Sequence, residues 1–212
     1  MTQDDIYTLI GSLGIVPVVN IENPEKAERL ALSLIEGGIP CVEVTLRTDG
    51  AFEAIRRIRR TFPDLAIGAG TVVNRTLARK AVKAGANFIV SPFFDRDTIK
   101  WCLKKRIAVI PGVMTPTEIG SCLALGISVV KFFPAESAGG VSMIKALSGP
   151  FPQVKFITTG GIDMKKLPEY SKISNILAVG GSWMAKSDLI ENEKWNEIAR
   201  LSREALGIMK RR

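Results

Sequence analysis

The stretch AVIPGVMTPTEIGSCLALGISVVKFFP, residues 108–134, contains a complete strand–helix–strand unit. Its two short apolar runs, 108–112 and 129–134, predict buried strands. Between them, Thr115 stands three residues before Glu118, which is the spacing of a capping box at the start of a helix. A helix that connects two buried strands in this way is typical of a parallel sheet.

The same alternation recurs along the rest of the chain, after a predicted N-terminal helix at 3–13. One further example is NPEKAERLALSLIEGG, a helical pattern with proline near its start and glycine at its end. Eight strand–helix units without a linker or a low-complexity segment predict one domain over residues 1–212, a (β/α)8 TIM barrel with an extra N-terminal helix. A doubly wound open sheet is the alternative. The predicted strands cover residues 15–20, 41–47, 66–70, 88–92, 108–112, 129–134, 155–160 and 176–181.

Composition limits the class of protein. With 46% hydrophobic and 24% charged residues, the chain has the balance of an ordinary globular domain. It has no apolar run near the roughly 18 residues that cross a bilayer, and its opening MTQDDIYTLIGS lacks the features of a signal peptide. We therefore expect a cytoplasmic protein without membrane contact. The three cysteines, Cys41, Cys102 and Cys122, are too few and too scattered for a disulfide framework or a metal cluster, so we expect reduced, buried thiols.

The charge pattern points to a small anionic ligand. The net charge is +8, and much of the excess lies on predicted helix surfaces such as IRRIRR and in the tail MKRR. No nucleic-acid-binding motif accompanies these residues, so we expect an acidic metabolite rather than nucleic acid. The sequence contains no histidine. Acid–base chemistry must therefore use carboxylates, lysine, tyrosine, cysteine or bound water.

Lys131 stands inside the apolar strand VVKFFP. Burying an unpaired ammonium is costly, and a buried neutral lysine is a nucleophile toward carbonyl carbons. Side chains alternate along a strand, so Glu43, Thr45 and Arg47 of CVEVTLR share the face that points into a barrel. We predict that Lys131 forms an imine and that Glu43 moves protons beside it. The alternative is a buried Lys–Glu ion pair without chemistry.

Paired glycines follow the last two predicted strands, in TTGGID and VGGSW. Backbone N–H groups of glycine-rich loops bind phosphate, and TIM barrels often hold phosphate between these two loops. The sequence therefore predicts a phosphate site formed by Gly160, Gly161, Gly180, Gly181 and Ser182.

Together these motifs resemble the bacterial 2-keto-3-deoxy-6-phosphogluconate (KDPG) aldolase family, which overlaps with the 4-hydroxy-2-oxoglutarate (KHG) aldolases. The resemblance runs over nearly the whole chain, through VEVTLRT, GAGTV, SP, IPGVMTPTE, KFFPAE, TGGI and GGSW in order. It implies a class I aldolase, a homotrimer of (β/α)8 barrels, that cleaves KDPG to pyruvate and glyceraldehyde 3-phosphate. Such an enzyme works through a lysine Schiff base and needs no metal or organic cofactor.

The resemblance also implies a role for each matching residue. Lys131 corresponds to the Schiff-base lysine and Glu43 to the general acid–base carboxylate. The implied substrate-binding residues are Arg47 and Thr71 at the keto-acid end, Phe133 beside the imine, Pro92 of the SP motif, and Thr159 with Gly160, Gly161, Gly180, Gly181 and Ser182 at the phosphate end.

Four positions depart from the pattern of many relatives: Asn20, Phe93, Phe94 and Thr158. They flank the substrate, so the length and the C4 stereochemistry of the substrate stay open. The alternatives are an aldolase for unphosphorylated KHG, with oxaloacetate decarboxylation as a side activity, a phosphate-binding isomerase or epimerase, and a non-catalytic anion-binding module. An isomerase needs no lysine nucleophile, so Lys131 argues against that alternative.

Overall fold

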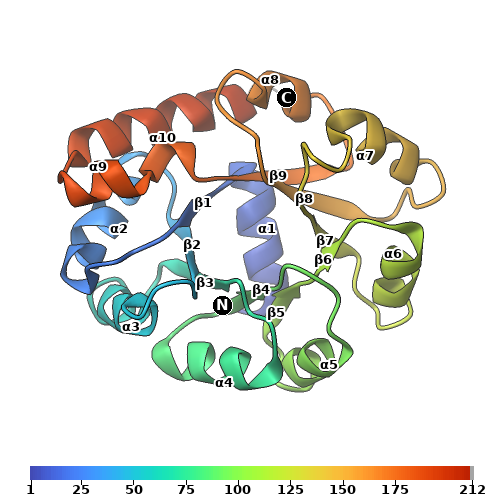
Figure 1. Cartoon of the computed structure of the whole chain (residues 1–212), viewed down its shortest axis with the longest axis horizontal. Helices are drawn as coiled ribbons and strands as arrows, with labels where there is room; N and C mark the ends of the chain where they lie inside the picture. Colours follow the sequence, from blue (N-terminus) through green and yellow to red (C-terminus); the bar gives the residue numbers. More distant parts are fainter. Residues whose placement is uncertain (211–212) are drawn as a thin grey trace.

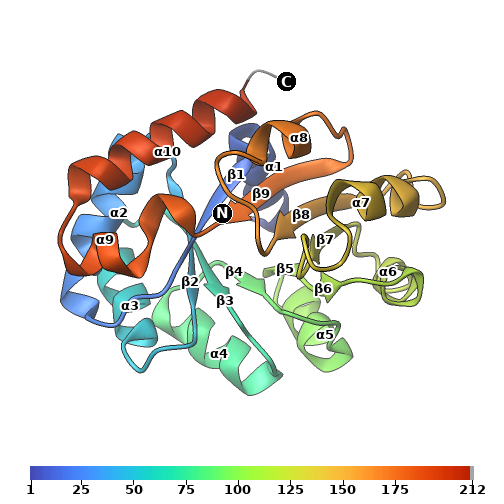
Figure 2. The ribbon, with the colours of Figure 1, turned by 45° about the horizontal axis from the view of Figure 1, so that its top comes forward.

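The computed structural model describes residues 1–210, which form one TIM barrel: a ring of parallel strands with helices around it (Figure 1). Figure 2 shows the strands gathered around a shared centre, with the helices on the outside. The fold class predicted from the sequence is confirmed.

The strands are β1 Ile15–Val19, β2 Cys41–Thr45, β3 Ala66–Gly70, β4 Phe88–Val90, β5 Ala108–Ile110, β6 Gly112–Val113, β7 Val129–Phe132, β8 Lys155–Thr159 and β9 Ile176–Gly181. The helices are α1 Gln3–Leu13, α2 Ala27–Glu36, α3 Ala51–Thr61, α4 Arg75–Ala84, α5 Arg96–Lys104, α6 Pro116–Leu123, α7 Gly140–Ser148, α8 Leu167–Ser171, α9 Ser187–Glu191 and α10 Trp195–Met209, with short 3-10 turns η1 Pro24–Lys26 and η2 Trp183–Ala185.

The strand order is β5-β4-β3-β2-β1-β9-β8-β7-β6, and every neighbouring pair is parallel. This order follows the chain around a ring, whereas a doubly wound sheet reverses its order at a switch point. The doubly wound alternative is therefore wrong.

The predicted strand 108–112 is divided into β5 and β6 at Pro111. β5 pairs with β4 and β6 pairs with β7, so this one segment joins the two edges of the ring. Lys131 N donates to Pro111 O over 2.8 Å, which continues the pairing across the division. Because one of the eight predicted strands is divided in two, the structure has nine strands within residues 1–210.

The N-terminal helix covers the amino end of the barrel. α1 spans the predicted residues, begins with a capping box from Thr2, and contacts β1, β5 and β9. The Tyr7 hydroxyl donates to Val109 O over 2.9 Å, and burial raises the pKa of that phenol well above its usual value. Because α1 occupies the amino end, the carboxyl ends of the strands form the accessible end of the barrel.

Apolar side chains fill the layer between strands and helices. Val42 and Val44 on β2 are fully buried, and the rings of Phe132 and Phe156 meet edge to face with their centroids 6.3 Å apart. The three cysteines are free and buried in this structure. In residues 1–210 no helix is both long enough and apolar enough to cross a membrane. The capping box predicted at Thr115 and Glu118 is present at the start of α6.

Candidate active site

Lys131 on β7 and Glu43 on β2 meet inside the barrel, with Lys131 Nζ 3.4 Å from Glu43 Oε1. Only 6% of Lys131 and 3% of Glu43 is exposed. The Glu43 carboxylate fits because Gly70 on the neighbouring strand β3 has no side chain. A Cβ atom at Gly70 would lie 2.2 Å from Glu43 Oε1. The pair is therefore held in a nearly dry space, where a charge is stabilised by its partner rather than by water.

Phe133 and Gly112 lie beside Lys131. Lys131 Nζ is 5.3 Å from the centroid of the Phe133 ring, close enough for the ring face to stabilise an ammonium or an iminium. Gly112 is the register partner of Lys131 on β6. A Cβ atom at Gly112 would lie 2.3 Å from the backbone of Pro92, so the SP segment packs directly against the strand next to Lys131.

Above the pair, a cleft opens among the carboxyl ends of β1, β2, β7, β8 and β9. Eight of the residues predicted for the site line it: Arg47, Phe133, Thr159, Gly160, Gly161, Gly180, Gly181 and Ser182. Glu43 and Lys131 lie deeper, in the barrel interior, whereas Thr71 and Pro92 belong to the loops after β3 and β4.

Arg47 lies beyond the strand on which it was predicted, because β2 ends at Thr45 and a turn follows. Its side chain is exposed at the rim of the cleft, where Arg47 Nε donates to Thr71 Oγ1 over 3.2 Å. Thr71 adopts a left-handed backbone conformation with φ 57°, which is uncommon for a β-branched residue. The two residues therefore form a hydrogen-bonded polar pair at the rim of the cleft.

The two glycine loops leave polar groups facing the cleft. Gly160 and Gly161 have φ angles of 108° and 77°, a backbone shape that other residues rarely adopt. The Thr159 side chain lies over Gly180, where a Cβ atom would be 2.5 Å from Thr159 Oγ1. Within the described part of the chain, Thr159 Oγ1 is buried and has no hydrogen-bond partner. Such an unpaired buried hydroxyl is available to a ligand.

Gly181 and Ser182 complete the second loop. The indole of Trp183 packs on Gly181, where a Cβ atom would lie 1.9 Å from the ring. This contact excludes any larger residue at Gly181, and it leaves Ser182 exposed at the edge of the cleft. A hydroxyl and backbone N–H groups at this place suit an oxyanion.

Val18, Asn20, Thr45 and Ile162 also line the cleft. Asn20 Oδ1 accepts a short hydrogen bond from Thr45 Oγ1, which fixes the orientation of the amide. Nothing in the sequence distinguishes Val18 and Ile162 as site residues, because apolar side chains in and after strands are typical of any barrel core. Asn20 carries a signal, since it is a polar residue that ends the apolar strand IVPVVN.

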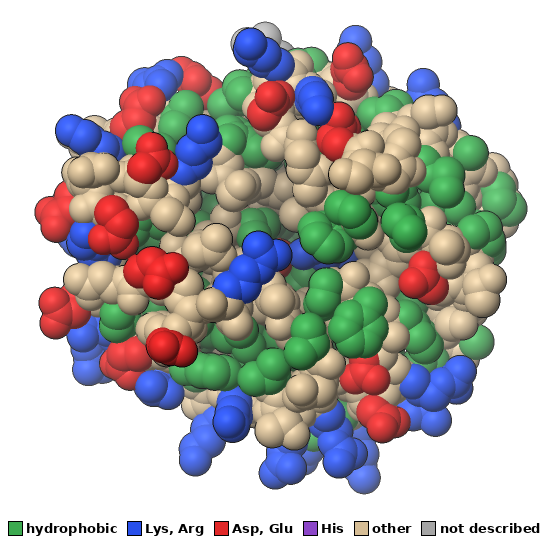
Figure 3. Space-filling view, in the orientation of Figure 1, with side chains coloured by type: hydrophobic (Ala, Val, Ile, Leu, Met, Phe, Trp, Pro, Cys, Tyr) green, Lys and Arg blue, Asp and Glu red, His purple; other side chains and the backbone are tan. Residues whose placement is uncertain are grey.

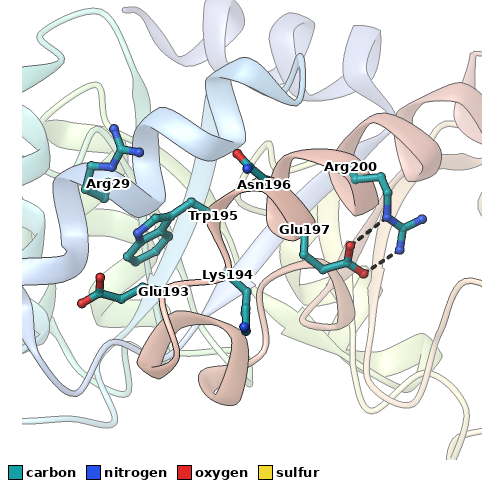
Figure 4. Close-up of a pocket in the computed structure, with 7 residues that line it drawn as sticks. All are labelled: Arg29, Glu193, Lys194, Trp195, Asn196, Glu197 and Arg200. Carbon is teal, nitrogen blue, oxygen red and sulfur yellow. Dashed lines mark hydrogen bonds and ion pairs between the residues drawn. The ribbon is translucent and has the colours of Figure 1, made fainter.

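A second pocket lies on the outer wall, between α2 and the start of α10, and holds none of the predicted site residues (Figure 4). Arg29, Glu193 and Trp195 stand on one side of it, and Glu197 and Arg200 form an ion pair on the other. Arg200 Nη2 lies 2.5 Å from Glu197 Oε1 in an ion pair on the protein surface, where such pairs contribute little energy. The cleft at the strand ends is therefore the candidate active site.

Comparison with known proteins identifies the family of this chain. A sequence model of the family described as KDPG and KHG aldolase matches residues 6–201. The chain belongs to the KDPG and KHG aldolase family. The resemblance seen in the sequence motifs is thereby confirmed.

Curated members of the family match over nearly their full length. The chain is 44% identical to the 2-dehydro-3-deoxy-phosphogluconate aldolase of Treponema pallidum, over 96% of this chain and 97% of that protein. It is 38% identical to the KHG/KDPG aldolase of Escherichia coli K12, over 91% of this chain and 90% of that protein.

Solved structures of KDPG aldolases have the same fold. The enzyme of Legionella pneumophila superposes with a TM-score of 0.91 at 42% identity, over 94% of this chain and 97% of that chain. In that crystal structure pyruvate is captured at low pH as a covalent carbinolamine intermediate. The Zymomonas mobilis ZM4 enzyme, solved with 3-phosphoglycerate, superposes with a TM-score of 0.88 at 36% identity, over 97% of each chain.

Proposed function

We propose that this member of the family is a class I aldolase, a carbon–carbon lyase that cleaves KDPG to pyruvate and glyceraldehyde 3-phosphate. The observation that carries the proposal is the buried pair of Lys131 and Glu43 beneath a cleft with two glycine loops. Full-length similarity to curated KDPG aldolases adds support.

The proposed reaction begins at Lys131 Nζ, which attacks the C2 carbonyl of the substrate. Lys131 gives up its proton to a carboxylate or water before the attack, and Glu43 at 3.4 Å is placed to accept it. Glu43 gives this proton to the hydroxyl of the carbinolamine, which leaves as water, so that an iminium forms and Glu43 is again a carboxylate. The ring face of Phe133, at 5.3 Å from Nζ, stabilises the positive charge.

The iminium then draws electrons from the C3–C4 bond. As the C4 hydroxyl loses its proton to Glu43, directly or through one water, the bond breaks and glyceraldehyde 3-phosphate leaves. The electron pair remains as an enamine on Lys131. Glu43 returns the proton to C3, and water hydrolyses the resulting pyruvate imine to free pyruvate and the amine. Atoms and protons balance over the cycle.

The subsites follow from the placement of the polar groups. Arg47 and Thr71 at the rim bind the keto-acid carboxylate, and Pro92 shapes the wall near β6. Thr159, Ser182 and the backbone of Gly160, Gly161, Gly180 and Gly181 bind the phosphate. The backbone N–H groups of such a loop can bind phosphate without a lysine or an arginine.

KHG is the second candidate substrate, because the E. coli relative carries both activities in its name. KHG has a carboxylate where KDPG has the phosphorylated end. The cleft offers hydroxyl and backbone N–H donors at that end. We expect these donors to bind the oxygens of a phosphate more strongly than a short carboxylate. We therefore rank KHG below KDPG.

A borohydride trapping experiment tests the imine. The protein is incubated with pyruvate and sodium borohydride, and the modified peptide is located by mass spectrometry. The expected result is one adduct on Lys131. A folded protein that gives no adduct, or an adduct on another lysine, contradicts the proposed mechanism. Rates with KDPG and with KHG then rank the two substrates.

We also propose that the protein is a homotrimer. Val73, Phe93 and Met114 are exposed by 40%, 44% and 42%, and they lie on the neighbouring loops after β3, β4 and β6. Hydrophobic side chains gather on this face of the molecule (Figure 3). Exposed apolar clusters of this kind favour self-association. Light scattering should give three times the chain mass, and Phe93→Asp should lower it; a monomeric unmodified protein contradicts the proposal.

A further inference from the structure

Glu136 stands outside the cleft, on the segment that follows β7, and joins three parts of the chain. Its carboxylate accepts a short hydrogen bond from the Tyr170 hydroxyl on α8. It also accepts a hydrogen bond of 2.5 Å from Lys166 Nζ. Lys166 Nζ donates in addition to Gly161 O over 3.2 Å, so the network reaches the first glycine loop of the cleft.

The backbone around Glu136 also holds that loop. Ala135 N donates to Thr159 O over 2.8 Å, and Glu136 N donates to Gly160 O over 3.0 Å. A Cβ atom at Gly161 would lie 2.8 Å from Glu136 Cβ, so the loop lies in direct contact with the Glu136 side chain. The backbone carbonyl of every residue from Thr159 to Gly161 thus accepts a hydrogen bond from Ala135, Glu136 or Lys166.

The protonation states of Glu136 and Tyr170 keep these hydrogen bonds in place at neutral pH. Hydrogen bonds from Lys166 and Tyr170 lower the pKa of Glu136, so the carboxylate is ionised. Burial and the hydrogen bond to Glu136 raise the pKa of Tyr170, so the phenol keeps its proton and donates it. Tyr170 is only 1% exposed, and its hydroxyl is oriented by the hydrogen bond to Glu136.

We propose that Glu136 is a positioning residue that holds the Thr159–Gly161 loop in the shape that binds the phosphate end of the substrate. The inference rests on the proposed function, because it assigns the loop to the phosphate subsite. Glu136 does not line the cleft, so it acts through the loop and not by contact with substrate. A loop that is already ordered loses less conformational entropy on binding, which strengthens binding without any new contact.

The test compares Glu136→Gln with Glu169→Gln. Glu169 is an exposed carboxylate on α8, the short helix that carries Tyr170, and no side-chain hydrogen bond ties it to the loop in residues 1–210. We expect Glu136→Gln to raise KM for KDPG about tenfold, the scale of one weakened charge-assisted hydrogen bond that orders a binding loop. The kcat for KDPG, the KM for unphosphorylated KHG and the trapping of pyruvate on Lys131 should stay close to those of the unmodified protein. Glu169→Gln should change none of these values.

Two results overturn the inference. An unchanged KM for KDPG shows that Glu136 does not position the loop, and an equal loss with KDPG and KHG shows a general role in folding. Should Glu136→Gln fail to fold, Tyr170→Phe removes only the hydroxyl donor and is expected to give the same selective rise in KM; no selective rise with this variant overturns the inference too.

A readout without turnover separates this inference from the proposed function. Inorganic phosphate should raise the melting temperature of the unmodified protein and of Glu169→Gln, and it should raise that of Glu136→Gln less. Loss of this difference contradicts the role of Glu136. A missing pyruvate adduct on Lys131 in the unmodified protein contradicts the aldolase mechanism and leaves the phosphate measurement intact.

Discussion

Lys131 Nζ lies 3.4 Å from Glu43 Oε1, although the two residues are 88 positions apart in the chain. The contact exists because β7 and β2 point these side chains into the same closed space. Buried ion pairs seldom add net stability, so the retention of two charges in a dry barrel interior needs a reason. Imine chemistry provides one, because it needs an amine that can lose its proton and a carboxylate that can take it.

Lys131→Met should abolish cleavage of KDPG and leave the fold intact. Methionine has a similar length and no amine, so it fills the space but cannot attack a carbonyl. Pyruvate release is measured by a coupled assay and folding by circular dichroism. Lys155→Met, at an exposed lysine amine on β8 that donates to Ser174 O, is the matched control and should keep full activity. Substantial turnover by Lys131→Met would reject the mechanism.

Glu43→Gln should separate imine formation from proton transfer. The amide keeps the size of the side chain but cannot accept a proton, and general acid–base groups contribute about 10²–10⁴-fold to rate. We expect a loss of that order in the exchange of the pyruvate methyl protons with deuterium, followed by NMR. Borohydride should still trap pyruvate on Lys131 in this variant. Exchange at the unmodified rate would assign the proton transfer to another group.

Gly70→Ala should lower kcat through a purely steric effect. The added methyl group would lie 2.2 Å from Glu43 Oε1, so the carboxylate must leave its present position 3.4 Å from Lys131 Nζ. Gly120→Ala on α6 is the control, because nothing lies within 4 Å of its Cβ position, and alanine in a helix is more stable than glycine by about 0.5–1 kcal/mol. Turnover rates and melting temperatures are compared. If Gly70→Ala keeps full activity, the position of Glu43 does not matter for catalysis.

The Glu136 network should give the protein a component of acid sensitivity. Hydrogen bonds from Lys166 and Tyr170 hold the pKa of Glu136 below the usual value of a glutamate, while burial and Asp163 oppose this shift. A carboxyl group with a lowered pKa in the folded state stabilises the fold above the pKa of the unfolded chain, and it loses this effect as the pH falls through the folded value. The melting temperature of Glu136→Gln should therefore lie below that of the unmodified protein at pH 7. The difference should shrink as the pH falls below about 4.3, the ordinary pKa of a glutamate. A difference that stays constant with pH would mean that the carboxylate charge is not involved.

Much of the fold and the central pair could be predicted from the sequence, because both depend on local periodicity. Alternating runs gave the strand–helix units, and strand parity gave the inward direction of Glu43. The division of the fifth strand at Pro111 depends on how two sheet edges meet, and the early end of β2 before Arg47 depends on a turn, so neither follows from periodicity. The contact of Glu136 with Tyr170 joins residues 34 apart through side chains alone, and no sequence pattern encodes such a contact.

Ser182→Ala should act on the phosphorylated substrate only. The Ser182 side chain is exposed at the edge of the cleft, and Gly181 beneath it is fixed by the Trp183 ring, so loss of the hydroxyl should not disturb the loop. A hydroxyl that donates to a phosphate oxygen contributes on the scale of one charge-assisted hydrogen bond, and we expect KM for KDPG to rise about tenfold. The KM for KHG should change little, because that substrate has no phosphate for Ser182 to contact. Steady-state kinetics on both substrates measure the two effects, with Ser187→Ala at the start of α9 as a control outside the cleft. Equal losses with KDPG and KHG would place Ser182 outside the phosphate subsite and would leave Thr159 and the glycine N–H groups to bind the phosphate.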